Sequence, residues 1–314
     1  MALPKFDVFL PDTITEAFEI LERYSADETA ILAGGTDLLV DIRRPIIPAH
    51  LPRCSGCDPK TGAPIAQKET SPKFLVSLSR IADLKGITVS DDEISIGSLT
   101  TITEVAESAI VRQHLTALAE GAENLGSPLV RNRGTFGGNI CNARPAADTL
   151  IPAYALSAKL ELISSKGVRL IPIEYFVIGP GKTKIEHGEV LTRIVFPKYD
   201  DYFGSACRKL ANRKALEISI VNAASFIRVD AKKKKINEAR ISMGAVGPTP
   251  ILAEKAAKYI MENNIQPDNF AKAGKIAAQE CRPITDHRGS ALYRIESVKV
   301  LVRRSLENAL KMVV

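Results

Sequence analysis

The chain has 314 residues, of which 45% are hydrophobic and 25% charged, a composition that excludes collagen-like and largely disordered proteins. Its 42 Lys and Arg residues against 36 Asp and Glu leave a net charge of +6, too small a surplus to predict a nucleic-acid-binding protein. No run approaches the roughly 18 apolar residues of a membrane span. Five cysteines and no secretory signal pattern favour a cytoplasmic location.

The N-terminal part alternates short strands with helices. Thr13 followed by Glu16 has the spacing of a capping box and predicts a helix that ends near Tyr24. We also expect strands at 6–9, 30–32, 74–78, 88–89, 93–97, 158–164 and 167–172, and helices at 103–109, 115–125 and 148–156. Residues 44–73 interrupt this pattern with a proline-rich stretch that has no helical or strand period.

The C-terminal part changes in style. Strand patterns at 190–196, 205–210, 218–229 and 236–246 predict a single antiparallel sheet. Helical patterns follow, at 253–263, 269–279 and 290–312. We expect a domain boundary near Asp200.

Two glycine pairs, Gly34-Gly35 and Gly137-Gly138, lie beside short apolar strands and small polar residues. Glycine tolerates positive φ and lets the backbone approach a ligand closely, so such turns can present N–H groups to an anionic oxygen. Two turns of this kind predict a diphosphate site. Neither matches the GxGxxG or GxxxxGK[ST] nucleotide-binding motif, and most isolated Gly-Gly pairs are only tight turns.

Several segments resemble one family, the FAD-binding (medium) subunits of molybdenum hydroxylases such as xanthine dehydrogenase, aerobic carbon monoxide dehydrogenase and 4-hydroxybenzoyl-CoA reductase. The most specific match is residues 126–148, GSPLVRNRGTFGGNICNARPAAD. Other matching segments are residues 32–39 (LAGGTDLL), 208–213 (RKLANR), 221–224 (VNAA), 244–249 (GAVGPT) and 288–294 (RGSALYR).

The resemblance implies an α+β fold with an FAD-binding domain of the vanillyl-alcohol-oxidase type at 1–199. That domain has two subdomains, 1–73, which includes the Pro/Cys insert at 44–73, and 74–199. A C-terminal flavoprotein domain, an antiparallel sheet with helices, occupies 200–314.

The resemblance also implies the FAD-binding residues, and it implies no catalytic side chain in this chain. The diphosphate is expected on the backbone of the two glycine segments, the flavin near Ala143, Pro145 and Asp148, and a cation, Lys209, beside the flavin. The expected binding residues are Leu32, Ala33, Gly34, Gly35, Thr36, Asp37, Leu38, Thr135, Gly137, Gly138, Asn139, Cys141, Ala143, Pro145, Asp148, Leu191, Ile194 and Lys209.

Two of these positions, and also Ile218, have alternative structural interpretations. Asp148 is also a candidate N-cap of the helix that follows it. Lys209 is also a candidate surface lysine on a strand. Ile218 matches a family position that packs beside the isoalloxazine ring, yet an apolar strand residue is more often part of the core.

In this family, electrons come from a molybdopterin site in a large subunit and two [2Fe-2S] clusters in a small subunit. They reach FAD in the medium subunit and then an external acceptor, for which NAD, ferredoxin and a quinone all remain open. The chain carries no recognisable motif for molybdopterin or for those clusters, so we expect both subunits as partners.

The insert at 44–73 departs from the simpler family members and contains His50, Cys54 and Cys57. Some relatives carry an additional [4Fe-4S] cluster on an inserted loop of this subunit. Such a cluster needs about four thiolates. Because the insert supplies only two, a loop without metal is the favoured interpretation, with partial ligation by Cys54 and Cys57 as the alternative.

Two other functions compete with that of an electron-transfer subunit. A standalone FAD-dependent oxidoreductase of the same superfamily would need acid–base residues near the flavin. The histidines, His50, His114, His187 and His287, show no clustering with the glycine segments. A scaffold without cofactor is disfavoured because the glycine segments are intact.

Overall fold

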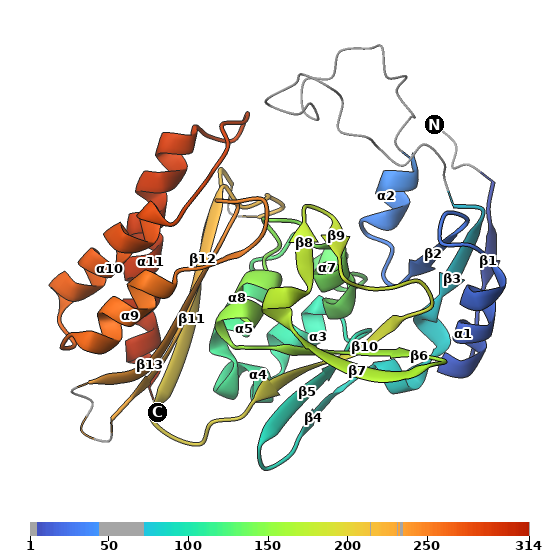
Figure 1. The fold of residues 1–314 in the computed structure, drawn as a ribbon, viewed down its shortest axis with the longest axis horizontal. Helices are drawn as coiled ribbons and strands as arrows, with labels where there is room; N and C mark the ends of the chain where they lie inside the picture. Colours follow the sequence, from blue (N-terminus) through green and yellow to red (C-terminus); the bar gives the residue numbers. More distant parts are fainter. Residues whose placement is uncertain (1–4, 44–71, 214, 231, 233–234, 314) are drawn as a thin grey trace. The chain divides into compact units, whose positions relative to one another are not determined.

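The computed structural model describes residues 5–43, 72–213, 215–230, 232 and 235–313 (Figure 1). The chain divides into two compact units, Met1–Ala82 and Asp83–Val314. The boundary expected near Asp200 lies within the second unit and stays a prediction.

The first unit is a small parallel sheet with strand order β1-β3-β2 and two helices. Helix α1 begins where predicted, because the Thr13 hydroxyl accepts a hydrogen bond from the Glu16 N–H (3.2 Å) and Glu16 in turn accepts from the Asp12 N–H (2.9 Å). The elements are β1 (Asp7–Phe9), α1 (Ile14–Arg23), β2 (Thr29–Leu32), α2 (Leu38–Arg43), β3 (Phe74–Ser77) and η1 (Leu78–Arg80). The short turn η2 (Ala82–Leu84) follows.

The second unit begins with a five-stranded antiparallel sheet of order β4-β5-β10-β6-β7. The predicted hairpins at 88–97 and 158–172 are confirmed as the pairs β4–β5 and β6–β7. The strands are β4 (Ile87–Val89), β5 (Glu93–Gly97), β6 (Lys159–Ser164), β7 (Gly167–Pro172) and β10 (Val190–Pro197), with a separate pair β8 (Val177–Gly179) and β9 (Lys182–Thr183) after the turn η3 (Ile173–Tyr175).

Short helices cover this sheet and share its core. Phe136 of α7 stacks on Phe196 of β10, with ring centroids 6.2 Å apart, and both rings are fully buried. The helices are α3 (Ile102–Glu107), α4 (Ala109–His114), α5 (Thr116–Glu123), α6 (Pro128–Arg131), α7 (Phe136–Asn142) and α8 (Leu150–Ala155).

The chain ends in a second antiparallel sheet, β11-β12-β13-β14, with three helices. Strand β12 is buried on both faces. The C-terminal helices lie on one face of this sheet, and α5 and α8 lie on the other (Figure 1). Ala224 and Phe226 of β12 belong to the core that includes α5 and α8, whereas Ala223 and Ile227 belong to the core built with the C-terminal helices. The elements are β11 (Phe203–Leu210), β12 (Val221–Val229), β13 (Ile236–Gly244), β14 (Ile251–Leu252), α9 (Glu254–Glu262), α10 (Pro267–Gln279) and α11 (Ala291–Lys311).

One strand prediction is wrong. Residues 190–196 were expected in the C-terminal sheet, but β10 pairs with β5 and β6 in the five-stranded sheet. Local pattern predicts that a segment is a strand, whereas the choice of partner depends on contacts distant in sequence. Here Ile194 pairs with Ile96 and Leu160, which lie far earlier in the chain.

Candidate functional site

The first glycine pair forms the turn at 33–37 that joins β2 to α2 in the first unit. Gly35 has a φ of +75°, a conformation that L side chains rarely adopt. A Cβ at this position would lie 3.0 Å from Leu39 Cδ1 and 3.2 Å from Leu32 Cδ1. Backbone conformation and crowding therefore both favour glycine here.

The same turn presents backbone donors. In the part of the chain that the structure describes, the N–H groups of Gly34, Gly35, Thr36 and Asp37 have no acceptor. The Gly35 carbonyl accepts from the Leu39 N–H at 3.2 Å, which fixes the first turn of α2. Successive unpaired N–H groups beside a helix start suit an anionic oxygen.

The second glycine pair is not a left-handed bend. Gly137 and Gly138 lie in the first turn of α7, and neither has a positive φ. Thr135 is the N-cap of this helix, because its hydroxyl accepts from the Gly138 N–H at 3.1 Å. The expectation of positive φ at this pair is therefore wrong: the glycines belong to a helix start.

The backbone N–H groups of this helix start are already paired. Phe136 donates to the Thr100 carbonyl (2.9 Å) and Gly137 to the Ser98 carbonyl (2.8 Å). A Cβ on Gly137 would lie 2.5 Å from Ser98 Cβ, so close packing accounts for this glycine. The buried Ser98 hydroxyl has no partner among the described residues. This segment can therefore offer side-chain hydroxyls to a ligand more readily than free N–H groups.

The stretch after α7 is held at two points. Ala143 ends the helix in the left-handed conformation with φ +47°, and its carbonyl accepts from the Gly181 N–H at 3.0 Å. The Pro145 carbonyl accepts from the Ala245 N–H at 2.7 Å. These bonds fix the irregular backbone that leads to Asp148.

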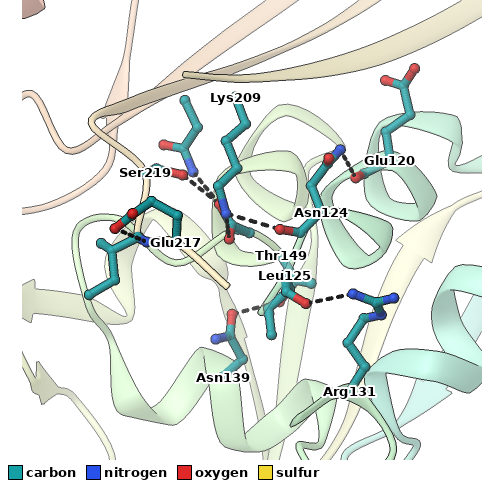
Figure 2. Close-up of polar contacts among 12 residues, drawn as sticks. Glu120, Asn124, Leu125, Arg131, Asn139, Thr149, Lys209, Glu217 and Ser219 are labelled. Carbon is teal, nitrogen blue, oxygen red and sulfur yellow. Dashed lines mark hydrogen bonds and ion pairs between the residues drawn. The ribbon is translucent and has the colours of Figure 1, made fainter. Parts of the chain in front are cut away.

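Asp148 and Lys209 form a buried ion pair, with Nζ 2.6 Å from Oδ2 (Figure 2). The two side chains are 9% and 11% exposed, so the interpretation of Lys209 as a surface lysine is wrong. Lys209 also donates to the Asn124 carbonyl at 3.0 Å. An ammonium has three N–H donors. In the described structure two are used, which leaves one for a ligand.

The Asp148 carboxylate has two further donors, Ser219 in the segment before β12 and Asn222 within β12. The Ser219 hydroxyl lies 2.6 Å from Oδ1, and the Asn222 amide lies 3.3 Å from the same oxygen. Asp148 does not cap the helix that follows it, because Thr149 occupies that position and makes no capping bond. Its carboxylate instead accepts hydrogen bonds from residues that are far away in sequence.

Burial and hydrogen bonding act on Asp148 in opposite directions. Burial raises the pKa of the Asp148 carboxyl, because the charged form loses solvent. The Lys209 ammonium, the Ser219 hydroxyl and the Asn222 amide lower that pKa and limit the rise. These three donors therefore stabilise the charged carboxylate against the cost of burial.

Helix α5 positions the strand that carries Lys209. Glu120 accepts from the Cys207 N–H (2.6 Å) and from Arg208 (2.8 Å). Its backbone carbonyl accepts from the Asn124 amide at 2.8 Å (Figure 2). These contacts fix both the strand that bears Lys209 and the Asn124 carbonyl that receives its second hydrogen bond.

Asn139 of α7 is connected to the same region. Its Oδ1 accepts from the Thr149 hydroxyl at 2.7 Å, one residue after Asp148 (Figure 2). Within the second unit, the structure thus brings Asn139, Asp148 and Lys209 into one hydrogen-bonded region.

Other predicted residues have different surroundings. Leu191 and Ile194 lie in the core of the five-stranded sheet, and Ile194 is fully buried. Ile218 is 52% exposed between β11 and β12, so its interpretation as a core residue is wrong. Burial raises the pKa of the Cys141 thiol to about 12, so this residue is a neutral, small group in α7.

The insert residues His50, Cys54 and Cys57 lie outside the described residues. Within the described ranges, no group of three or more His, Cys, Asp or Glu side chains could hold a metal ion. Over the same ranges, no helix is long and apolar enough to cross a bilayer.

Prediction from the sequence missed Glu120, Ser219 and Asn222. One signal was present: Asn222 is a polar residue inside the apolar strand at 221–229, and such a residue needs a buried partner. Nothing local identified the roles of Glu120 and Ser219, because Cys207 and Asp148, the partners of their side chains, lie 87 and 71 positions away in sequence.

Two family models match the chain. Residues 59–199 match the FAD binding domain in molybdopterin dehydrogenase, and residues 206–309 match the CO dehydrogenase flavoprotein C-terminal domain. The xanthine dehydrogenase FAD-binding subunit of Escherichia coli O157:H7 is 31% identical over 95% of this chain and 93% of its own length. The carbon monoxide dehydrogenase medium chain of Hydrogenophaga pseudoflava is 28% identical over 98% of both chains.

Solved structures give the same result. A chain of carbon monoxide dehydrogenase from Hydrogenophaga pseudoflava superposes with a TM-score of 0.86 at 27% identity and covers 100% of both chains. A chain of quinoline 2-oxidoreductase from Pseudomonas putida 86 superposes with a TM-score of 0.85 at 25% identity and covers 99% of both. These matches confirm the predicted α+β fold, an FAD-binding domain followed by a C-terminal antiparallel sheet with helices. The chain therefore belongs to the family of FAD-binding medium subunits of molybdenum hydroxylases, and it is an oxidoreductase subunit whose cofactor is FAD.

Proposed function

We propose that the chain binds the FAD diphosphate through the turn at 33–37, with Leu32 and Leu38 at its two ends. The observation that carries the proposal is the row of N–H groups at Gly34, Gly35, Thr36 and Asp37, which have no acceptor within the described residues. Their donors and the missing side chain at Gly35 fit an anionic group that must approach the backbone closely.

The segment 135–145, in the second unit, makes a different contribution to FAD binding. Its helix-start amides already have acceptors, so it binds through the Thr135 hydroxyl, the Asn139 amide and the backbone at Gly138, while Gly137 packs on Ser98 and lets the helix start lie close to that strand end. Cys141, Ala143 and Pro145 provide small surfaces without charge. Leu191 and Ile194 act from the core, where they support the sheet beneath the site.

Lys209 donates its remaining N–H to the flavin. Asp148 and the Asn124 carbonyl hold the ammonium in place through two hydrogen bonds. A positive charge beside the flavin favours its reduced, anionic form. Asp148 fixes the position of the Lys209 ammonium, and its negative charge partly offsets the positive charge of that ammonium.

The chain transfers electrons from the [2Fe-2S] clusters of an iron–sulfur small subunit, in a complex with a molybdopterin large subunit, to an external acceptor. When bound, FAD supplies the conversion between one-electron and two-electron transfer. NAD, ferredoxin and a quinone all remain candidates for the acceptor. We expect the complex in the cytoplasm. Within this chain, we expect an FAD-binding domain at 1–199 and a C-terminal domain at 200–314.

A standalone FAD-dependent oxidoreductase is the alternative. It would need an acid–base side chain near the flavin. Within the described residues, the hydrogen bonds of Asp148 and Lys209 go to each other, to Ser219 and Asn222 and to the Asn124 carbonyl, and His114 stacks on Phe203 with centroids 6.2 Å apart. This arrangement favours an electron-transfer subunit.

Purification of the native complex tests the proposal. A tagged chain should carry flavin absorbance and copurify with iron–sulfur and molybdenum chains. Flavin without those chains, together with turnover of a substrate by the isolated protein, would support the standalone enzyme instead.

A further inference from the structure

Arg294 in α11 is an almost completely buried arginine, 3% exposed, that the proposed FAD site does not use. It ends the segment 288–294, one of the matches to the family for which the cofactor provides no explanation. A buried guanidinium is costly unless it is paired and hydrogen-bonded. Its contacts therefore indicate what the segment does.

The Arg294 guanidinium connects three separate segments. Nη1 donates to the Ile220 carbonyl (2.6 Å) and to the Ala245 carbonyl (2.9 Å). Nη2 pairs with Asp286 at 2.7 Å, and the Arg288 guanidinium holds the other oxygen of Asp286 at 3.2 Å. The planar fork of arginine can satisfy all three acceptors at once, which a lysine ammonium on its flexible stem does less well.

The first of these segments leads directly to the ion pair. Ile220 follows Ser219, whose hydroxyl lies 2.6 Å from Asp148 Oδ1. The N–H of Ile220 also donates to the Leu210 carbonyl at 2.8 Å, next to Lys209. The Ile220 carbonyl, held by Arg294, therefore lies on the short segment that supplies a donor to Asp148.

The second segment leads to the backbone at Pro145. Ala245 has a φ of +60°, unfavourable for a residue with a Cβ. Its carbonyl is held by Arg294 and its N–H donates to the Pro145 carbonyl at 2.7 Å. Strained residues persist only where the surroundings fix them. The hydrogen bond from Arg294 is one of the contacts that hold Ala245 in this conformation.

We propose that Arg294 is a positioning residue that holds the Ile220 and Ala245 carbonyls and so sets the geometry of Asp148, Lys209 and Pro145 at the flavin. This inference rests on the proposed roles of Lys209 and Pro145 in FAD binding. Arg294 does not itself touch the cofactor. It acts through Ser219 on one side and through Ala245 on the other.

The test compares Arg294→Lys with Arg303→Lys in the full chain. Arg303 lies in the same helix, so it controls for the loss of a guanidinium from α11. Arg294→Lys should weaken FAD binding by about tenfold, which corresponds to one charge-assisted hydrogen bond. It should also shift the flavin reduction potential. Arg303→Lys should change neither.

Amide hydrogen exchange gives a readout that does not need the cofactor. The Ile220 and Ala245 N–H groups should exchange at least about tenfold faster in Arg294→Lys, because the same lost bond no longer holds their segments. Asp286→Asn, a milder change that removes only the counter-charge, should shift both quantities in the same direction. It keeps the proposal testable if Arg294→Lys does not fold.

Lys209→Met separates failure of this proposal from failure of the proposed function. If Lys209→Met alters flavin affinity or potential while Arg294→Lys and Asp286→Asn alter neither, the positioning role is overturned and the FAD site stands. If Lys209→Met leaves both flavin properties unchanged, the proposed FAD contact of Lys209 fails and the positioning role fails with it.

Discussion

The Lys209 ammonium and the Asp148 carboxylate lie 2.6 Å apart, and their side chains are only 11% and 9% exposed. The pair joins strand β11 of the C-terminal sheet to the segment that precedes α8. A buried pair of this kind need not add net stability, yet loss of one partner leaves the other charge without compensation. Lys209 and Asp148 therefore have to be studied together.

Lys209→Met should lower both the stability of the chain and the flavin reduction potential. We expect a loss of about 3–5 kcal/mol in the free energy of unfolding, as for other broken buried pairs. The double variant Lys209→Met/Asp148→Asn should regain part of this stability but not the potential, because the positive charge is still missing. Urea unfolding and a redox titration of each variant measure the two effects. A double variant no more stable than Lys209→Met would contradict the pairing.

Thr135→Ala should destabilise α7 and weaken FAD binding together. The Thr135 hydroxyl caps the Gly138 N–H, and loss of an N-cap typically costs about 1 kcal/mol. Thr13→Ala removes the equivalent cap from α1 and is the matched control. It should cost similar stability without loss of flavin. Equal flavin affinity in the two variants would remove Thr135 from the binding site.

Cys141 should resist alkylation in the native protein. Because burial raises the pKa of its thiol to about 12, only about one molecule in ten thousand carries the reactive thiolate at pH 8. Peptide mass spectrometry after iodoacetamide treatment should show Cys141 unmodified in native protein and fully modified in urea. Labelling of native Cys141 at the rate of a free thiol would show that the group is accessible and ionised.

Asp286 should give the chain an acid-dependent component of stability. Burial by itself raises the pKa of Asp286, but the Arg288 N–H and the Arg294 and Arg288 guanidinium groups outweigh it and lower that pKa. Because the folded pKa lies below the unfolded value of about 3.9, the contribution is present above that pH and is lost as the pH falls through the folded value. The stability difference between the wild type and Asp286→Asn should therefore shrink from pH 7 to pH 3. A difference independent of pH would exclude this linkage.

The sequence predicted most elements of this fold because their signals are local. The Thr13 cap, the apolar face of α11 and the hairpin β6–β7 each depend on neighbouring residues. The pairing of β10 and the contacts of Asp148 depend instead on residues distant along the chain. The resemblance singled out both Lys209 and Asp148, but it did not predict that they pair, since they are 61 residues apart in sequence.

The glycine pairs illustrate the same limit. Both suggested tight turns, and only Gly35 has the positive φ that such a turn requires. Gly137 is needed because the Ser98 backbone and side chain pack against it, a contact that no local pattern contains. The glycine pairs therefore predicted the backbone conformation at Gly35 but not at Gly137 and Gly138.

A titration of FAD into the full chain tests most directly the claim that each glycine segment is needed to bind FAD. The wild type should bind one FAD per chain, and Gly35→Val and Gly138→Val should each abolish binding. Gly188→Ala, at a φ of +85° with open space around it, controls for the cost of positive φ at Gly35 and should retain flavin. Full binding of one FAD by either valine variant, with the fold intact by circular dichroism, would contradict the account.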